Sequence, residues 1–424
     1  MDLLDQVLRK ENLTKAYRHV LTNKGSAGVD GIEPGHLKEH LQIHWADMQG
    51  ALENGRYQPQ AIFGVSIPKG NGGSRLLGIP TSTDRMLQQA IHQVLSPLFD
   101  PEFSEYSYGF RPNRRASQAI DQALSYINEG YQQIVDIDLK NFFDEVNHDY
   151  LMNLLKSKVE DPRLLRLIWR YLRSPMQING KMHKRRKGVP QGGPLSPLLS
   201  NIVLNELDQE LEQRGLRFVR YADDFSIFVK TPRAAYRVRQ RISRFIEDSL
   251  HLYVNMKKSA ICKPLNYEYL GFAFESSYRK GVSGHYRLVV SKDSLASLKY
   301  KIKMITRKTI PTSFDERIVR LNQLMRGWLQ YFKHASIKAK LKYLDAWVRN
   351  RLRYCIWHHW KKSKRRVKNL IRLGVKPEMA WQWGHSRMGG WAVSCSPILG
   401  TTITIDRLHQ RGYCSFLDYY LKIR

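Results

Sequence analysis

The 424-residue sequence contains few cysteines, and their spacing does not suit disulfide bonds or a metal site. There are four, all far apart and without a C-x-x-C pair: Cys262, Cys355, Cys395 and Cys414. This pattern excludes a disulfide framework and a zinc knuckle. It is typical of a protein in a reducing compartment, and we expect a cytoplasmic location.

Long apolar stretches are also missing. No stretch approaches the roughly 18 apolar residues that a membrane span requires, so no membrane partner is expected. The first ten residues, MDLLDQVLRK, are amphipathic and partly acidic, without the apolar centre of a signal peptide. Hydrophobic residues still make up 42% of the chain, which is enough for packed cores and argues against wholesale disorder.

Acidic residues are scarce relative to basic ones. The chain has 38 Asp and Glu against 69 Lys and Arg, giving a formal net charge of +31 at pH 7. A surface this basic gathers phosphates and releases their counterions. Nucleic acid is therefore the predicted partner.

The order of predicted elements indicates two kinds of domain. A hairpin is predicted over Val65–Pro80, a strand leading into a helix over Gln133–Val146, and a strand–turn–strand over Phe218–Val229. From Ala296 to Arg372, helical patterns dominate, with 22 Lys and Arg against three acids and several interleaved Trp residues. We predict an α+β sheet domain followed by a basic helical domain.

Carboxylates at the ends of apolar strands are the main candidates for chemistry. Asp138 ends the first strand, Asp136 lies two residues earlier on the same face, and Asp223 and Asp224 occupy the later turn. Two carboxylates about 4 Å apart repel by roughly 4 kcal/mol at an effective dielectric of 20, which a divalent cation relieves. Oxygen ligands without His or Cys favour Mg²⁺ over Zn²⁺. Two such ions would stabilise the attacking and leaving oxygens of phosphoryl transfer.

A lone Asp–Asp pair is as often a turn former as a ligand pair. Neighbouring side chains on an extended strand point to opposite faces. We therefore expect Asp138 and Asp223 to bridge the metal ions, with Asp224 in a secondary place.

A series of motifs in fixed order resembles the conserved boxes of reverse transcriptases, in the version of bacterial group II intron reverse transcriptases and maturases. The motifs are IPKGNGGSRLLGIP (67–80), SYGFRPNRRASQAI (107–120), DLKNFFD (138–144), PQGGPLSP (190–197), YADD (221–224), NMKKS (255–259) and YLGF (269–272). The resemblance implies a right-hand polymerase with fingers, palm and helical thumb. It implies the following division: 1–62 an N-terminal extension, 63–290 fingers and palm, 291–372 thumb or maturase domain, and 373–424 a DNA-binding region.

The resemblance also implies a nucleotide site beside the metal ligands Asp138, Asp223 and Asp224. Phe143 corresponds to the aromatic gate that leaves no space for a 2′-hydroxyl, and Gly192 would allow close backbone approach. Either Lys258 or the adjacent Lys257 could protonate the departing pyrophosphate. The implied nucleotide-binding residues are Lys69, Arg75, Phe143, Gln191, Gly192 and Lys258.

The basic, aromatic C-terminal half is predicted to bind RNA, since phosphates set affinity and aromatic faces stack unpaired bases. The candidate nucleic-acid contacts, on both halves, are Gly28, Arg111, Arg326, Trp328, Arg351, Lys361, Lys362, Arg365 and Arg366. For any single Trp, core packing remains the ordinary alternative.

The resemblance implies an RNA-directed DNA polymerase that uses two Mg²⁺, with Mn²⁺ as a possible substitute, and also acts as a maturase. The implied partners are group II intron RNA, an RNA template with a DNA primer, target DNA and deoxynucleotides. An H-N-H endonuclease, present in many relatives, does not follow, so second-strand cleavage is not expected. Three alternatives stay open: a host-adopted reverse transcriptase in DNA repair or a defence locus, a non-catalytic RNA-binding splicing factor, and, more distantly, an RNA-dependent RNA polymerase.

Overall fold

The computed structural model describes residues 2–68, 74–278 and 284–424. The chain divides into two compact units, Met1–Lys263 and Pro264–Arg424, each with its own packed interior. They are described in turn.

The N-terminal unit mixes helices and strands. Its helices are α1 (Leu3–Leu8), α2 (Lys10–Asn23), α3 (Leu37–Glu53), α4 (Ser82–Phe99), α5 (Ala116–Asn128), α6 (Phe142–Glu145), α7 (His148–Lys156), α8 (Pro162–Arg173), α9 (Ser196–Gln213) and α10 (Pro232–Asp248), with short 3₁₀ turns at Pro34–His36 and Asp100–Glu102. Its strands are β1 (Ile62–Pro68), β2 (Ser74–Ile79), β3 (Gln133–Ile137), β4 (Met176–Ile178), β5 (Lys181–His183), β6 (Arg217–Tyr221), β7 (Asp224–Val229) and β8 (Ala260–Cys262).

The predicted hairpin around residue 70 forms strands β1 and β2. They pair antiparallel from Phe63 opposite Ile79 to Pro68 opposite Ser74. Strand β4 adds to β1 in parallel, and β5 pairs with β4, giving the sheet order β2-β1-β4-β5. The tip of the hairpin, including the candidate Lys69, lies outside the described residues.

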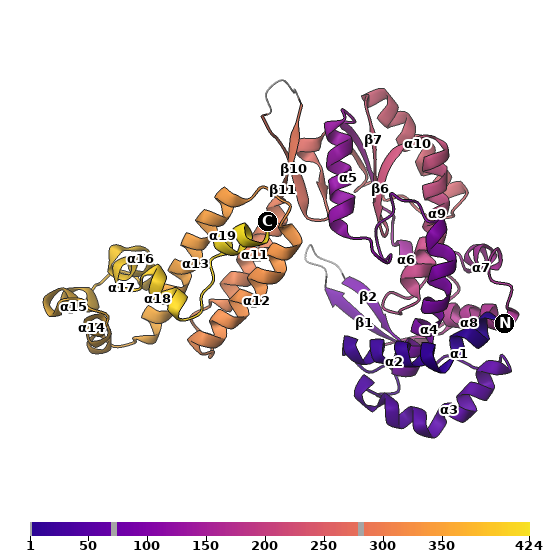
Figure 1. Ribbon diagram of the computed structural model, residues 1–424, viewed down its shortest axis with the longest axis horizontal. Coiled ribbons are helices and arrows are strands. Elements are labelled where there is room, and N and C mark those ends of the chain that lie inside the picture. Colours follow the sequence, from indigo (N-terminus) through magenta and orange to yellow (C-terminus); the bar gives the residue numbers. More distant parts are fainter. Residues whose placement is uncertain (1, 69–73, 279–283) are drawn as a thin grey trace. The chain divides into compact units, whose positions relative to one another are not determined.

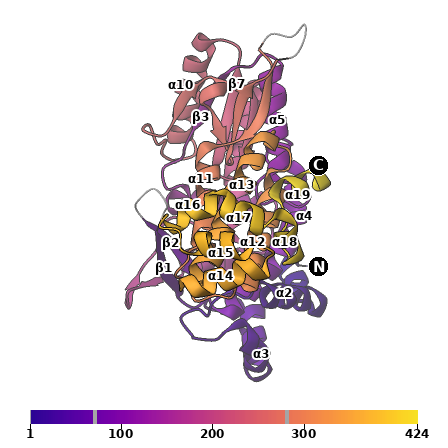
Figure 2. The same ribbon diagram turned by 90° about the vertical axis from the view of Figure 1, so that its left-hand side faces the viewer.

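The second sheet has the order β6-β7-β3-β8 and is antiparallel throughout. Helices α10 and α5 lie on either side of strands β3 and β7 (Figure 2). Apolar residues of β3 and β7, such as Ile134, Val135 and Phe225, are fully buried because helices cover them. This packing fixes the register of the strands whose ends carry the acidic residues.

The first helices are anchored to the rest of the N-terminal unit. The backbone N–H of Leu4 donates to Asp161 Oδ2 (2.8 Å), and the side chain of Asn12 donates to the carbonyl of Ala90 in α4 (3.1 Å). Leu4 and Val7 are buried in the same core as α4. The segment predicted as an N-terminal extension therefore belongs to the core of this unit.

The C-terminal unit is mainly helical. Its elements are a 3₁₀ turn (Pro264–Asn266), β9 (Glu268–Tyr269), β10 (Phe272–Ser276), β11 (Tyr286–Val290), α11 (Lys292–Ile305), α12 (Phe314–Phe332), α13 (Lys338–His359), α14 (Ser363–Arg372), α15 (Pro377–Gly384), α16 (Gly390–Cys395), α17 (Pro397–Thr402), α18 (Ile405–Gln410) and α19 (Phe416–Ile423). Figure 1 shows α11, α12 and α13 side by side with α19, and α14 and α15 as a separate helical pair.

The small sheet β11-β10-β9 packs on the helices of this unit. Phe272 of β10 contacts Phe332 of α12, with ring centroids 4.8 Å apart. Leu270 and Gly271, both at positive φ, form the two-residue turn between β9 and β10. The motif YLGF thus opens the C-terminal unit, and the finer division of the chain at residues 62, 290 and 372 stays a prediction.

The predicted fold class, α+β with a following helical domain, is confirmed. No helix in the described part of the chain combines the length and the apolar character needed to cross a bilayer.

Candidate active site

Strands β3 and β7 bring the candidate carboxylates to one end of their sheet. Their antiparallel register runs to Ile137 opposite Phe225, so Asp138 and Asp224 are the next residues at the adjoining strand ends. Asp136 lies opposite Ser226, and residues two apart on a strand share a face. The spacing therefore places Asp136, Asp138 and Asp224 on the same side of the sheet.

These acids line an open cavity of about 320 Å³. It is lined by Asp136, Ile137, Asp138, Asp223, Asp224 and Lys258. The structure thus brings together all three predicted metal ligands and the predicted pyrophosphate-side lysine. Of the two adjacent lysines considered for the pyrophosphate side, Lys257 and Lys258, it is Lys258 that lines this cavity.

Burial and mutual repulsion act on the acids of the cavity. Burial, together with the nearby charges of Asp136, Asp223 and Asp138, raises the pKa of Asp224 to about 7. The pKa of Asp223 is raised by burial and by Asp138, while Arg75 and Arg220 lower it. These carboxylates hold strongly unfavourable charge, which a bound cation would relieve.

The motif NMKKS supports the cavity from the side of β8. The Asn255 side chain donates to Asp138 Oδ2 (2.8 Å), and the Ser259 hydroxyl accepts from the backbone N–H of Asp138 (3.0 Å). On the neighbouring strand, Ser226 donates to Asp136 Oδ1 (2.8 Å). Asp138 is therefore held at both its carboxylate and its backbone N–H, and Asp136 is held at its carboxylate.

The donor set suits a hard divalent cation. Among the described residues, no group of three or more His, Cys, Asp and Glu side chains is arranged so that it could hold a metal ion by itself. The four carboxylates around the cavity are oxygen donors, and Mg²⁺ keeps several open positions for water and substrate phosphates rather than taking an all-protein cage. The residues present therefore fit a divalent metal ion whose coordination is completed by substrate.

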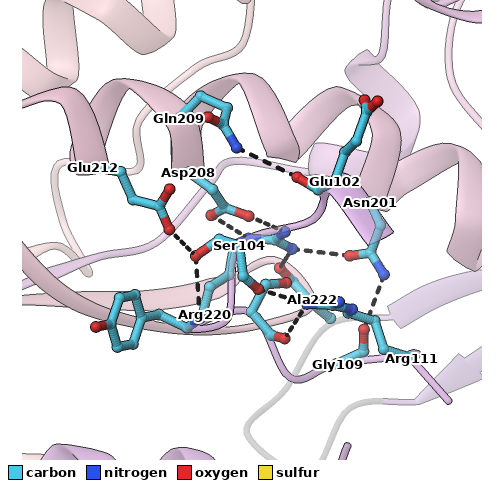
Figure 3. Close-up of polar contacts among 12 residues, drawn as sticks. Glu102, Ser104, Gly109, Arg111, Asn201, Asp208, Gln209, Glu212, Arg220 and Ala222 are labelled. Carbon is cyan, nitrogen blue, oxygen red and sulfur yellow. Dashed lines mark hydrogen bonds and ion pairs between the residues drawn. The ribbon is translucent and has the colours of Figure 1, made fainter. Parts of the chain in front are cut away.

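The turn that carries Asp223 is held from behind by a buried polar network (Figure 3). Arg220 is fully buried; its Nε donates to Asp208 Oδ1 (2.7 Å), and its Nη1 donates to Asn201 Oδ1 and to the carbonyl of Ala222 (both 2.9 Å). Asn201 in turn donates to the carbonyl of Gly109 (2.9 Å). The network ties helix α9 to both sides of the turn.

The backbone at this turn is strained and tightly packed. Ala222 has φ of 59°, a left-handed conformation that costs a residue with a side chain energy. A Cβ built on Gly109 would lie 2.2 Å from the nitrogen of Ala222, so only glycine fits beside the turn. Sequence reasoning missed Arg220, Asp208 and Asn201; the one available signal was an arginine inside the apolar strand FVRY.

The predicted nucleotide-side residues lie on neighbouring elements. Phe143 is partly buried in α6, edge-on to Phe142 with centroids 5.2 Å apart, and its carbonyl accepts from Val189 N (2.6 Å). The carbonyl of Gln191 accepts from the backbone N–H of Gly78 in β2 (2.7 Å). These contacts dock the PQGG loop against the β1–β2 hairpin.

Gly192 and Arg75 complete this group. Gly192 has φ of 121°, and a Cβ there would lie 2.3 Å from the carbonyl oxygen of Gly78, so the loop requires glycine. Gly192 lines a separate cavity of about 430 Å³ that it shares with Phe110 and Arg85. Arg75 is exposed on β2, and its charge acts on Asp223.

Several predicted nucleic-acid contacts are engaged within the fold. Arg111 forms an ion pair with Asp100 (2.7 Å) and donates to three backbone carbonyls, and its side chain is only 5% exposed. A Cβ on Gly28 would lie 2.7 Å from Thr81 Cα. Arg351 donates to the hydroxyl and carbonyl of Thr306. These contacts favour structural roles for all three.

The remaining candidates lie in the C-terminal unit. Trp328 is half-buried against Phe332, with ring centroids 4.6 Å apart, and Arg366 lies over the Trp357 ring at 4.6 Å. The exposed cations among the predicted contacts are Arg326, Lys361, Lys362 and Arg365.

Comparison with known proteins identifies the family of the chain. Residues 67–274 match the family described as reverse transcriptase (RNA-dependent DNA polymerase), and residues 295–374 match the group II intron maturase-specific domain. Protein YkfC of Escherichia coli (strain K12) is 33% identical over 299 residues, which are 61% of this chain and 78% of that protein.

Group II intron-encoded protein LtrA of Lactococcus lactis subsp. cremoris is 34% identical over 222 residues, which are 50% of this chain but only 36% of LtrA. A solved structure titled partial Cas6-RT-Cas1–Cas2 complex is 29% identical, covers 58% of this chain and 43% of that chain, and has a TM-score of 0.39. The family indicated by the motifs is confirmed: the chain belongs to the group II intron reverse transcriptases and maturases, with a reverse transcriptase domain followed by a maturase-specific domain.

Proposed function

We propose that this chain copies an RNA template into complementary DNA by adding deoxynucleotides to a primer 3′-hydroxyl. The observation that carries the proposal is the cavity lined by Asp138, Asp223 and Asp224 at the ends of β3 and β7. A cluster of partly buried acids in a chain with a net charge of +31 has a clear physical purpose if it binds cations that meet substrate phosphates.

The carboxylates of Asp138, Asp223 and Asp224 would hold two Mg²⁺ ions, with Mn²⁺ as a substitute. When bound, such ions stabilise the charge that develops on the attacking and leaving oxygens. Lys258, which lines the same cavity, would neutralise or protonate the departing pyrophosphate. Arg75 would steer the triphosphate, and Phe143 would exclude the 2′-hydroxyl.

We further propose that the chain binds group II intron RNA and assists its splicing, and that residues 373–424 contact target DNA. The match of residues 295–374 to a maturase-specific domain supports this, together with the excess of cations from Ala296 to Arg372. Here the protein would stabilise the folded RNA through its phosphates, while the RNA performs the splicing chemistry.

Primer extension tests the polymerase proposal. Purified protein is given poly(rA), oligo(dT), dTTP and Mg²⁺, and Asp138→Asn and Asp223→Asn are compared with wild type. Each substitution removes a ligand charge, and we expect a loss of about a hundred-fold or more, equivalent to several kcal/mol of transition-state stabilisation. The matched control is Asp47→Asn, an exposed acid on α3, which should extend normally.

Removal of metal by EDTA should abolish extension, and added Mg²⁺ or Mn²⁺ should restore it. Full activity in both acid variants would refute the metal-site assignment. Intron splicing at low Mg²⁺, with and without protein, tests the maturase role. A protein that supports splicing but never extends a primer would be the non-catalytic splicing factor instead.

A further inference from the structure

The helical pair α14–α15 carries an apolar groove that the polymerase site does not use. Its lining alternates between cationic and apolar side chains: Lys364, Val367, Lys368 and Ile371 from one face of α14, with Trp381 and His385 from α15 and its end. The groove encloses about 420 Å³, within the size range of small-molecule sites. Figure 1 shows α14 and α15 as neighbouring helices.

Close packing of the two helices shapes this groove. A Cβ on Gly384 would lie 2.6 Å from Val367 Cγ2, so glycine lets α15 approach α14 at that end. Leu370 and Ala380 are fully buried, whereas the adjoining Ile371 and Trp381 are 43% and 62% exposed. The groove therefore rests on closely packed helices, and its aromatic side is exposed to solvent.

The aromatic wall is preorganised. The rings of Trp381 and His385 lie 4.7 Å apart at an interplanar angle of 35°, and His385 Nδ1 lies 2.9 Å from the carbonyl oxygen of Trp381. A large exposed aromatic face is removed from water when a flat ring stacks on it. The shape and chemistry of this wall suit a planar ring as ligand.

The charge around the groove selects an anionic ligand. Between residues 361 and 395 there are nine Lys and Arg and a single acid, Glu378. Within the described residues, Lys364 and Lys368 take part in no ion pair, and both are exposed. Lysine is depleted in the cores of protein–protein interfaces, so a protein partner is disfavoured here.

We propose that this groove binds an unpaired nucleobase of folded RNA, with Trp381 stacking on the base and Lys364 and Lys368 contacting the adjacent phosphates. A planar ring next to phosphates is a nucleotide, and bases inside a duplex are already stacked on both faces. Loops and bulges of folded RNA present unpaired bases, and α14, which carries both lysines, lies within the segment that matches the maturase-specific domain. Helix α15, which carries Trp381, follows that segment and belongs to the region proposed above to contact target DNA, so single-stranded DNA is the competing occupant in the test. This inference rests on the proposed RNA-binding function.

The test uses the full chain and an RNA stem–loop with 2-aminopurine at one loop position, compared with a blunt RNA duplex of the same stem. Binding of wild type should quench the 2-aminopurine fluorescence as the base stacks. Trp381→Ala should weaken stem–loop binding about ten-fold, about 1.4 kcal/mol, and remove most of the quench, while duplex binding stays unchanged. Trp381→Phe should keep most of both signals.

Two further variants sharpen the result. Met379→Ala, which removes an exposed apolar side chain from α15 outside the groove, should bind like wild type. Replacing Lys364 and Lys368 with Gln should reduce the slope of log affinity against log salt by about 1.4, because each neutralised phosphate of a single strand contributes about 0.7 to that slope.

The outcomes separate this inference from the proposed function. If wild type binds neither RNA, the proposed RNA-binding function fails and this inference with it. If wild type binds the stem–loop but Trp381→Ala changes nothing, or weakens duplex equally, only the groove assignment is overturned. Equal, Trp381-dependent binding of single-stranded DNA with the loop sequence would overturn RNA as the occupant.

Discussion

Arg220 and Asp208 form an ion pair in which neither side chain is exposed to solvent. The arginine precedes the acidic turn by two residues and reaches across it to the carbonyl of Ala222 (2.9 Å). A buried pair of this kind is costly to desolvate and contributes little net stability by itself. Instead, the pair holds the turn that carries Asp223 in a fixed position relative to helix α9.

This arrangement predicts different results for breaking the pair and for replacing it. Asp208→Ala leaves Arg220 buried without its partner, and we expect a loss of about 3–5 kcal/mol in the free energy of unfolding. A double variant, Arg220→Met with Asp208→Leu, removes both charges and should recover most of that stability. Urea denaturation of the three proteins measures the difference.

Activity should not recover with stability. The double variant lacks the hydrogen bond to the carbonyl of Ala222, so the turn is less firmly held, and we expect kcat in primer extension to fall while the KM for primer–template changes little. Wild-type kcat in a stably folded double variant would show that the pair has no positioning role.

Gly109 provides a second test of the same turn. Its added Cβ would meet the backbone nitrogen of Ala222 at 2.2 Å, and backbone cannot move aside as a flexible side chain can. We expect Gly109→Ala to displace the turn and reduce primer extension strongly. Gly50→Ala on helix α3 is the matched control, because nothing lies within 4 Å of its added Cβ. That control should be active and slightly more stable, by about 0.5–1 kcal/mol, since alanine favours helix. Equal activities of the two variants would contradict the prediction.

The features that could be predicted from the sequence are those that depend on residues close together in the chain. Two short apolar stretches flanking a glycine-rich turn predicted the β1–β2 hairpin, and acids at strand ends predicted the positions of Asp138 and Asp223. Helix periodicity likewise predicted the helices between Ala296 and Arg372. These signals are readable because each involves residues close together in the chain.

Other features could not be read in this way. The pairing of Arg220 with Asp208 joins a strand to a helix, and neither residue reveals its partner or its burial locally. The β4–β5 hairpin was missed although Asn179–Gly180, a strong turn signal, lies at its tip, because the short flanking strands lack apolar alternation. Association of β9–β11 with the helical unit depends on aromatic packing such as that of Phe272 on Phe332, which only the fold reveals.

The proposed gate role of Phe143 predicts that the enzyme prefers deoxynucleotides to ribonucleotides. Shortening it to alanine removes the ring proposed to exclude the 2′-hydroxyl, so Phe143→Ala should incorporate ribonucleotides more readily than wild type. Single-nucleotide extension with rNTP and dNTP measures the ratio of the two kcat/KM values. Phe142→Leu is the control: that neighbour is buried in the core and in edge contact with Phe143, and its loss should lower stability without changing the ratio. Unchanged selectivity in Phe143→Ala would remove the gate assignment.

Asp345 anchors the last helix of the C-terminal unit. It is 3% exposed and accepts four hydrogen bonds, from the Tyr413 hydroxyl (2.7 Å), the Ser415 hydroxyl (2.9 Å), Phe416 N (2.8 Å) and Leu417 N (2.9 Å). Burial together with the Asp345 charge raises the pKa of Tyr413, which stays a neutral donor. The carboxylate thus satisfies the free N–H groups at the start of α19.

Removing this anchor should release α19 from α13. Asp345→Ala leaves two hydroxyls and two backbone N–H groups without their acceptor, and we expect the C-terminal unit to lose about 3 kcal/mol or more. Hydrogen exchange at the amides of Phe416 and Leu417 should accelerate accordingly. Asp418→Ala, an exposed acid in the first turn of the same helix, should cost only about 0.3–1 kcal/mol through the helix dipole. Slow exchange in Asp345→Ala, equal to that of the Asp418 control, would show that apolar packing around Phe416 and Tyr420 holds α19 without this carboxylate.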